Sequence, residues 1–123
     1  MTSASKSWPY AVIYDPDAVV EIVTAVKSKE ELRAILNAVA KLRELGERLD
    51  PPHMKPLQGV AATALRELRP RQGRSDWRAL YRRYGPIYVI LAVDRHKNFS
   101  ALVARGQERA ARYGGGLLNP DKF

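Results

Sequence analysis

The chain lacks cysteine altogether and has no long hydrophobic segment. Without cysteine there is neither a disulfide framework nor a thiolate metal site. The longest unbroken apolar run, Ile87–Val93, is far shorter than the roughly 20 residues that a membrane-spanning helix needs. The first residues, MTSASKSW, contain no apolar signal core. We therefore expect a cytoplasmic protein that makes no use of the membrane.

Groups able to perform catalysis are also scarce. The chain has only two histidines, His53 and His96. A magnesium site needs several carboxylate oxygens at one point, yet Asp76 and Asp94 stand singly among cations. A metal-dependent nuclease is therefore disfavoured, and no cofactor is expected.

Positive charge is abundant but unevenly placed. Residues 1–65 contain eight basic and eight acidic side chains, whereas residues 66–112 contain twelve basic and four acidic ones, which accounts for the whole net charge of +8. Eleven of those twelve cations are arginine, whose planar guanidinium makes bidentate contacts to phosphate and stacks on rings. The asymmetry favours a polyanionic partner such as nucleic acid. A merely solvated basic face is the alternative.

The length suits one domain, which we expect over residues 10–113, with a disordered segment 1–9 before it and a flexible tail 114–123 after it. The apolar pattern predicts an α+β fold in the order β-α-α-β-β-β-α. Its sheet is expected to be small, antiparallel-rich and about four-stranded, with the helices packed on one face. The expected strands are 10–14, 64–69, 77–84 and 87–93, and the expected helices are 16–26, 29–49 and 100–113.

Local signals support these boundaries. Asp15 before Pro16 can cap the first helix, Ser28 and Glu31 form a capping box for the second, and Ser100 can cap the third. The Pro-rich segment 53–59 is expected to be a loop. Helical spacing predicts inward-facing apolar residues, which are Val19, Ile22, Val23 and Val26, then Leu32, Ile35, Leu36, Val39, Leu42, Leu45 and Leu49, and finally Leu102, Val103, Ala110 and Tyr113.

Strand alternation assigns side chains of segment 77–83 to two faces. Trp77, Ala79 and Tyr81 are expected beneath the helices, and Arg78 and Arg82 on an open face. An open face with several arginines, neighbouring tyrosines and a basic loop would form a groove for single-stranded RNA. The residues expected to bind RNA are Lys55, His53, Arg71, Arg74, Tyr81, Arg82 and Arg95.

The same groove offers groups for cleaving RNA without metal. Such cleavage needs a base for the 2′-hydroxyl, cations for the phosphate and an acid for the leaving oxygen. His96 lies between Arg95 and Lys97 at the end of an apolar strand, where a neutral imidazole could act as the base. His53 precedes the sheet and could reach the same edge. For either histidine, a plain surface or packing role is the alternative.

The order of PHMKPLQG, LRELRP, WRALYRR and YVILAVDRHKN, followed by a basic helix, resembles the RelE/HigB toxin superfamily, closest to its phage-derived HigB-like branch. The resemblance implies a RelE-like fold and a type II toxin that cuts mRNA on the ribosome without metal and is held inactive by a helix-turn-helix, HigA-like antitoxin. It also implies roles for matched residues. These are Arg78 as the catalytic arginine, Arg69, His96 and Lys97 as further catalytic cations, and Lys55 as a phosphate or ribosomal RNA contact.

Some positions depart from the family pattern. Leu65 and Glu67 stand where the RelE branch has lysines, and Arg66 stands where the HigB-like branch has an aromatic residue. The basic loop of that branch is here replaced by residues 95–100, so the identity of the base stays open. Two alternatives also stay open, a ParE-like toxin of the same fold that inhibits gyrase and a non-catalytic nucleic-acid-binding domain.

Overall fold

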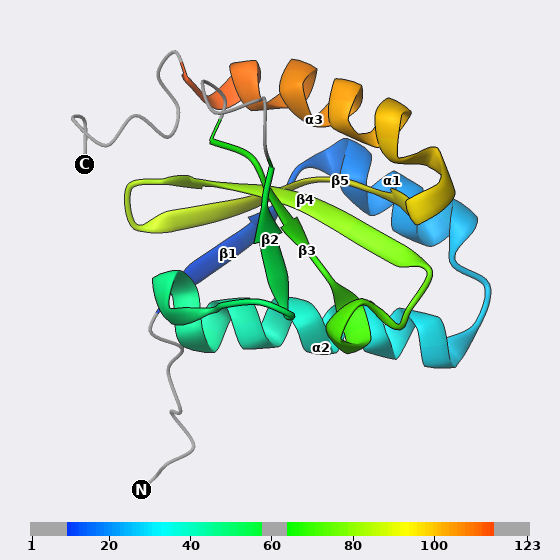
Figure 1. Cartoon of the computed structure of the whole chain (residues 1–123). Helices are drawn as coiled ribbons and strands as arrows, with labels where there is room; N and C mark the ends of the chain where they lie inside the picture. Colours follow the sequence, from blue (N-terminus) through cyan, green and yellow to red (C-terminus); the bar gives the residue numbers. More distant parts are fainter. Residues whose placement is uncertain (1–9, 58–63, 115–123) are drawn as a thin grey trace, which may run out of the picture.

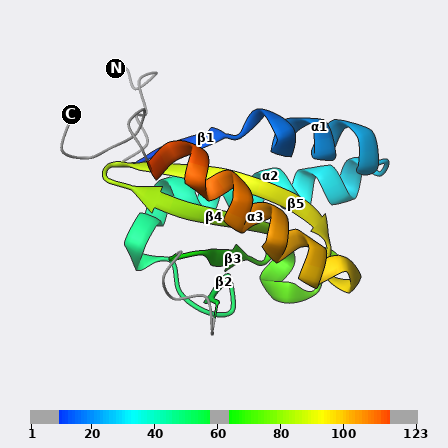
Figure 2. The ribbon, with the colours of Figure 1, turned by 90° about the horizontal axis from the view of Figure 1, so that it is seen from above.

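The computed structural model describes residues 10–57 and 64–114, and Figures 1 and 2 show their arrangement. The expectations of a disordered segment 1–9 and a flexible tail fall outside these residues, except that Gly114 ends the last helix. The strands are β1 (Ala11–Tyr14), β2 (Met54–Pro56), β3 (Arg66–Leu68), β4 (Trp77–Tyr84) and β5 (Ile87–Arg95). The helices are α1 (Pro16–Ala25), α2 (Lys29–Leu45) and α3 (Phe99–Gly114), and the short 3₁₀ turns are η2 (Gly46–Arg48), η4 (Pro70–Gly73) and η5 (His96–Asn98).

The five strands form one mixed sheet in the order β1-β5-β4-β3-β2. β1 runs parallel to β5, and every other pair is antiparallel. The α+β class is therefore confirmed, but the expected number of about four strands is wrong. The additional strand is β2, within the segment expected to be a loop. It has three residues and contains Pro56, which lacks a backbone N–H and is tolerated because β2 lies at the sheet edge.

Helices cover both faces of the sheet, so the expectation of helices on one face is wrong. α2 lies below the sheet and α3 above it in Figure 1. The α2 side buries Ile35, Val39 and Leu42 against Trp77, Tyr81, Tyr88 and Ile90. The α3 side buries Leu102, Ala110 and Tyr113 against Leu80, Val89 and Leu91. This double cover explains why β5 is apolar on both of its alternating faces.

The helix boundaries agree with the local signals at two of three starts. The Asp15 side chain accepts a hydrogen bond from the Asp17 N–H at 2.8 Å, and the Ser28 hydroxyl accepts one from the Glu31 N–H at 3.3 Å. The third helix begins at Phe99, so the expected Ser100 cap is wrong. α2 ends at Leu45, short of the expected residue 49, because Gly46 adopts a positive φ of 54° and the chain turns into η2.

Several apolar residues expected in the core are exposed. Val19 and Val23 on α1 are 43% and 71% exposed, and Leu32 and Leu36 on α2 are 36% and 47% exposed. α1 follows β1 and continues along β5 beyond the end of β1. There it buries only Ala18 and Ile22, while the Glu21 carboxylate accepts the Val93 N–H at 2.9 Å. A helix that covers a sheet edge buries a narrow stripe, which leaves the rest of its apolar face in solvent.

α3 is attached to the rest of the fold by arginines. Arg109 donates to both oxygens of Glu21 at 2.9 Å, and Arg112 donates to both oxygens of Asp15 at 3.1 Å. Asp15 is fully buried and also accepts the Tyr113 hydroxyl at 2.6 Å. A large part of the basic second half of the chain thus serves to hold the fold together. None of the helices in the described ranges has the length and apolar character needed to cross a membrane.

Candidate active site and nucleic-acid interface

Ion pairs divide the twelve basic residues of the segment 66–112 into two groups. Seven lie in ion pairs with carboxylates, and these are Arg66, Arg78, Arg83, Arg95, Arg105, Arg109 and Arg112. The other five have no ion pair with a carboxylate in the described part of the chain, and these are Arg69, Arg71, Arg74, Arg82 and Lys97. Only the second group is free to neutralise phosphate without first breaking an internal pair.

Four of these five cations gather at one end of the sheet. β3 ends, β4 begins and β5 ends on the same side, since the three strands are antiparallel neighbours. The His96 N–H donates to the Asp76 carbonyl at 2.7 Å, which ties η5 to the β3–β4 connection. We call residues 69–76 the arginine turn; it carries Arg69, Arg71 and Arg74, and Lys97 lies on the adjoining η5. Arg82 lies further along β4, with its guanidinium 4.9 Å from the centre of the Tyr84 ring.

The arginine turn has an unusual backbone. Arg71 and Gln72 both adopt left-handed conformations, with φ of 54° and 59°. Each such residue costs about 1–2 kcal/mol relative to a right-handed one, so the turn needs support. The Arg74 N–H and the Ser75 N–H donate to the carbonyls of Arg71 and Pro70 at 3.1 and 3.3 Å. Strained backbone of this kind is common where a protein holds a side chain ready for a ligand.

Arg78 supplies the rest of that support from inside the protein. Its Nη1 donates to the Ser75 carbonyl at 2.6 Å and to the Trp77 carbonyl at 2.7 Å, and its Nη2 donates to the Gly73 carbonyl at 3.2 Å. Its Nε lies 2.8 Å from Oε2 of Glu67, as an ion pair without an aligned hydrogen bond. Arg78 is only 5% exposed. The expectation that Arg78 projects from an open face is therefore wrong, because α3 covers this side of β4 and Glu67 occupies the guanidinium.

A cleft of about 280 Å³ lies between the β2–β3 pair and the start of α3. It brings together Lys55 from β2, Glu67 from β3 and His96 from η5. The wall is apolar and consists of Pro56, Leu57, Phe99 and Val103. The His96 and Phe99 rings lie 5.8 Å apart between centres, which gives the imidazole a packing partner while it stays exposed.

The cleft contains a set of groups suited to phosphate chemistry. Lys55 and His96 are exposed at its rim. Glu67 is 4% exposed in its lining and forms an ion pair with Arg78. Arg69 approaches Arg78 outside the cleft, because a Cβ added at Gly73 would meet the Arg69 Nη2 at 2.9 Å and the Gly73 carbonyl accepts a hydrogen bond from Arg78. Of the residues expected to be catalytic, His96 lines the cleft, Arg78 lies behind Glu67, and Arg69 approaches Arg78 at Gly73 but lines the opposite pocket. Lys97 is exposed next to His96.

Glu67 is the member of the cleft that the sequence did not identify as a site residue. Strand alternation places Leu65 and Glu67 on one face and Arg66 and Leu68 on the other. Because Leu65 is buried, Glu67 on the same face is buried too, and a buried carboxylate needs a cation. Arg78 is that cation.

Other residues expected to bind RNA lie elsewhere. Tyr81 is completely buried on the α2 side of the sheet, and this burial raises the pKa of its hydroxyl to about 12. It cannot contact RNA, so that expectation is wrong. The Arg95 guanidinium lies 4.6 Å from the centre of the Trp77 ring and donates to Asp76 at 2.8 Å. The hydrogen bond from Arg95 to Asp76 raises the pKa of the arginine. The positive charge of Arg95 is thus paired with a carboxylate of the same protein.

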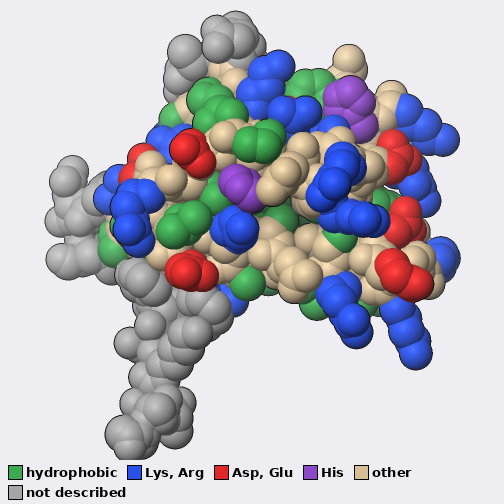
Figure 3. Space-filling view, turned by 60° about the horizontal axis from the view of Figure 1, so that its bottom comes forward, with side chains coloured by type: hydrophobic (Ala, Val, Ile, Leu, Met, Phe, Trp, Pro, Cys, Tyr) green, Lys and Arg blue, Asp and Glu red, His purple; other side chains and the backbone are tan. Residues whose placement is uncertain are grey.

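His53 does not join His96. It lines a separate pocket on the α2 side, together with residues of the arginine turn. Figure 3, in which the bottom of Figure 1 is turned forward, shows Lys and Arg side chains spread over this face with Asp and Glu side chains among them. The cations of the arginine turn therefore face the α2 side as well as the end of the sheet.

Within residues 10–57 and 64–114, no group of three or more histidine, aspartate or glutamate side chains is placed to hold a metal ion. Compared with protein-family models and with curated proteins, the chain matches none of either kind. The cleft and the arginine turn are therefore interpreted from their own chemistry.

Proposed function

We propose that the protein is a toxin of a type II toxin-antitoxin system and acts as a RelE/HigB-like endoribonuclease that cuts mRNA on the ribosome and so inhibits translation. The observation that carries this proposal is the cleft, in which Lys55, Glu67 and His96 come together from three separate segments. The arginine turn, whose arginines form no ion pair with carboxylates of the described ranges, lies at the same end of the sheet as His96. The sequence resemblance to the RelE/HigB superfamily supports the same activity.

The chemistry follows from the positions of these groups. The scissile phosphate binds at the mouth of the cleft beside Lys55, which neutralises its charge as the phosphorane forms. His96 takes the proton from the 2′-hydroxyl, so that the 2′-oxygen attacks phosphorus. The bond from phosphorus to the 5′-oxygen breaks, and the Lys55 ammonium gives that oxygen its proton. The products are a 2′,3′-cyclic phosphate and a 5′-hydroxyl end, and no metal takes part.

Arg78 has a positioning role in this scheme. Its guanidinium holds the carbonyls of Gly73 and Ser75 in the arginine turn and neutralises Glu67. Without it the turn that carries Arg69 would lose its internal support. The family role of a catalytic arginine that touches phosphate would require Arg78 to exchange Glu67 for the substrate.

The activity is tested with purified protein, ribosomes and a defined mRNA, by mapping the 5′ ends of the products. We expect His96→Ala and Lys55→Ala to slow cleavage by about 10²–10⁴-fold, the usual contribution of a proton-transfer group. Lys29→Ala, an exposed cation at the start of α2, is the matched control and should cleave normally. Intact mRNA in the presence of wild-type protein, together with arrested growth of cells that produce it, would contradict the proposal.

A non-catalytic nucleic-acid-binding domain is the second candidate, and the buried Arg78–Glu67 pair favours it. A buried guanidinium already engaged by a carboxylate and three carbonyls is poorly placed to receive a phosphate. In this case RNA would bind with the same salt dependence, while no cleavage would appear with or without ribosomes.

The proposed partner is a helix-turn-helix, HigA-like antitoxin. Exposed apolar side chains on the outer faces of α1 and α2 offer it a surface away from the cleft, and these are Val19, Val20, Val23, Leu32 and Leu36. Exposed apolar side chains commonly mark protein contacts where they form a patch, and Val19, Val20 and Val23 belong to one short helix, α1. Val23→Glu should therefore abolish co-purification with the product of a neighbouring antitoxin gene while leaving mRNA cleavage intact. Loss of cleavage in this variant, or an unchanged complex, would place the contact elsewhere.

A further inference from the structure

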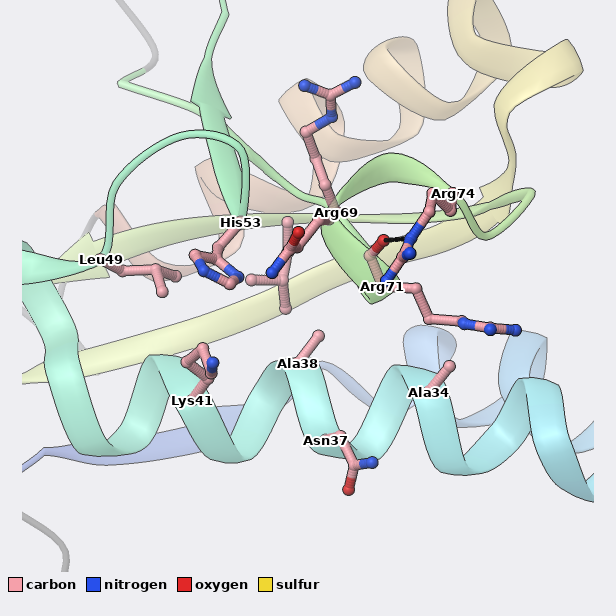
Figure 4. A pocket seen from close by; sticks show the side chains of 11 residues that line it. Ala34, Asn37, Ala38, Lys41, Leu49, His53, Arg69, Arg71 and Arg74 are labelled. Atoms are coloured by element: carbon pink, nitrogen blue, oxygen red, sulfur yellow. Dashed lines mark hydrogen bonds between the residues drawn. The ribbon is translucent and has the colours of Figure 1, made fainter.

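A second pocket, of about 200 Å³, lies between α2 and the arginine turn, and Figure 4 shows it from close by. Its apolar lining comes from Ala34, Ala38, Leu49 and Leu68. The polar lining contains no acidic residue and consists of Asn37, Lys41, His53, Arg69, Arg71, Gln72 and Arg74. In Figure 4 the His53 ring points toward α2 and Ala38, whereas the side chains of Asn37 and Arg69 point away. We call this the α2-side pocket.

The cations around the α2-side pocket are available to a ligand. Lys41, Arg71 and Arg74 form no ion pair with any carboxylate of the described ranges. The Arg74 Nε donates to the Arg71 carbonyl at 3.1 Å, as the dashed line in Figure 4 marks, which fixes the Arg74 side chain against the backbone of Arg71. Both arginines line the pocket at its Ala34 end, whereas Lys41 lies at the other end. Two guanidinium groups at one end of a pocket suit a phosphate.

The pocket and the cleft lie on opposite sides of the β2–β3 pair. Along each strand, neighbouring side chains alternate between the two sides. Thus Lys55 and Glu67 line the cleft, while Leu68 lines the α2-side pocket. The arginine turn connects the two sites around the strand ends. An RNA strand bound across this turn could occupy both.

We propose that the α2-side pocket binds one nucleotide of single-stranded RNA, with its base against Ala38, Leu68 and the His53 ring and its phosphate on Arg71 and Arg74. An apolar interior with an aromatic ring suits a base, because unstacked RNA bases are bound by stacking and apolar contact. The volume is below the roughly 300–1,000 Å³ of pockets for drug-sized ligands, which limits the occupant to a single base. The inference rests on the proposed function only in taking RNA as the source of the nucleotide.

A neighbouring acidic residue, Glu30, predicts a substitution that strengthens ligand binding instead of weakening it. Glu30, Glu31 and Asp76 lie on the far side of Arg71 and Arg74, in an adjoining depression. Glu31 and Asp76 are engaged by Arg95, at 3.7 and 2.8 Å, but Glu30 forms no ion pair within the described ranges. Its carboxylate therefore lowers the positive potential at the pocket, and Glu30→Gln should tighten binding of an anionic ligand.

The test is calorimetric titration of the full chain with AMP, adenosine and inorganic phosphate, with no RNA cleavage involved. We expect AMP to bind at least tenfold more tightly than either of the other two, since it alone uses both halves of the pocket. Arg71→Ala and Arg74→Ala should each weaken AMP about tenfold, as loss of one charge-assisted contact does. Ala38→Leu should fill the pocket and weaken AMP and adenosine alike, and Glu30→Gln should strengthen AMP a few-fold.

The controls are Lys29→Ala and Ala101→Leu, exposed positions on α2 and α3, which should bind AMP as the unaltered protein does. His96→Ala should also retain AMP binding, so the test of the pocket is independent of the test of the proposed cleavage. The proposal is overturned if AMP shows no saturable binding, or if phosphate binds as tightly as AMP, which would indicate a plain anion site. Unchanged AMP affinity in Arg71→Ala, a substitution at an exposed side chain, would equally overturn it.

Discussion

Arg78→Ala is the substitution that most directly examines the interior of the candidate site. The change removes a guanidinium that is 5% exposed, from a carboxylate 2.8 Å away and from three carbonyl oxygens. It leaves Glu67 as a buried charge without a partner, which costs about 3–5 kcal/mol. Because small domains are stable by only roughly 5–15 kcal/mol, we expect this variant to be close to unfolding at physiological temperature.

The magnitude is measured by urea unfolding followed by circular dichroism, beside two companions. Arg78→Met combined with Glu67→Leu removes both charges and should recover more than half of the loss, since no buried ion remains. Arg83→Ala removes an arginine whose side chain is 46% exposed and should change stability by about 0–1 kcal/mol. If Arg78→Ala costs less than about 1 kcal/mol and couples to Glu67 by nothing measurable, the pair is not buried as described. Because the double variant remains folded, its rate of mRNA cleavage shows whether Arg78 and Glu67 contribute to the reaction apart from their effect on stability.

Two further predictions concern stability. Burial raises the pKa of the Tyr81 hydroxyl to about 12, above its ordinary value near 10, so the stability this neutral group contributes is complete below pH 10 and is lost as pH rises from 10 toward 12. Burial also raises the pKa of the Tyr88 and Tyr113 hydroxyls, so Tyr81 contributes roughly 1.4 kcal/mol per pH unit to a larger loss of stability at high pH. Tyr81→Phe should make the slope shallower by that amount, and an unchanged slope would show that Tyr81 ionises freely. Gly46→Ala should cost about 1–3 kcal/mol because a Cβ at φ 54° is strained and meets the Tyr10 ring. Gly85→Ala, at φ 61°, measures the strain alone, and equal losses in the two variants would exclude the Tyr10 contact.

Elements set by local chemistry could be predicted from the sequence. The Asp15 and Ser28 caps and the Gly85-Pro86 hairpin depend on neighbouring residues, and they lie where expected. β2 was missed because its three residues have no pattern of their own. It is a strand only because β3 provides the hydrogen-bonding partner.

The layering of the helices was harder to predict because it depends on contacts between distant segments. The two-sided apolar pattern of β5 already indicated cover on both faces, yet nothing local identifies α3 as the second layer. Arg109 meets Glu21 across 88 positions of the chain, and no spacing rule reveals that pair. The exposure of Val23 has the same origin, since helical periodicity shows which face of α1 is apolar but not how much of it the sheet edge covers.

The candidate site was predicted in part. Alternation placed Arg78 on the correct side of β4, together with Leu80, and placed Tyr81 on the other. The expectation of an open face failed because Leu80 is buried by α3 and Arg78 by Glu67. Charge counting located the excess in the second half of the chain, but it could not separate cations used inside the fold from those free to bind RNA.

That separation makes a quantitative prediction about RNA affinity. Seven of the twelve cations in residues 66–112 are paired internally. The cations left around the cleft and the turn are Lys55, Arg69, Arg71, Arg74 and Lys97. For single-stranded RNA each phosphate neutralised lowers the logarithm of the binding constant by about 0.7 per logarithmic unit of salt. Five contacts predict a slope of about −3.5, whereas engagement of all twelve basic residues of the segment would give about −8.

The slope is measured by titrating a labelled, non-cleavable RNA analogue at several salt concentrations. Arg71→Ala and Lys97→Ala should each make it shallower by about 0.7, because each removes one phosphate contact. Arg83→Ala, in which the lost cation is already paired with Glu47 at 3.8 Å, should leave it unchanged. A slope near −8, or an equal response to Arg83→Ala, would mean that RNA opens the internal ion pairs. In that case RNA binding would have to loosen α3, because Arg109 and Arg112 form ion pairs between this helix and α1.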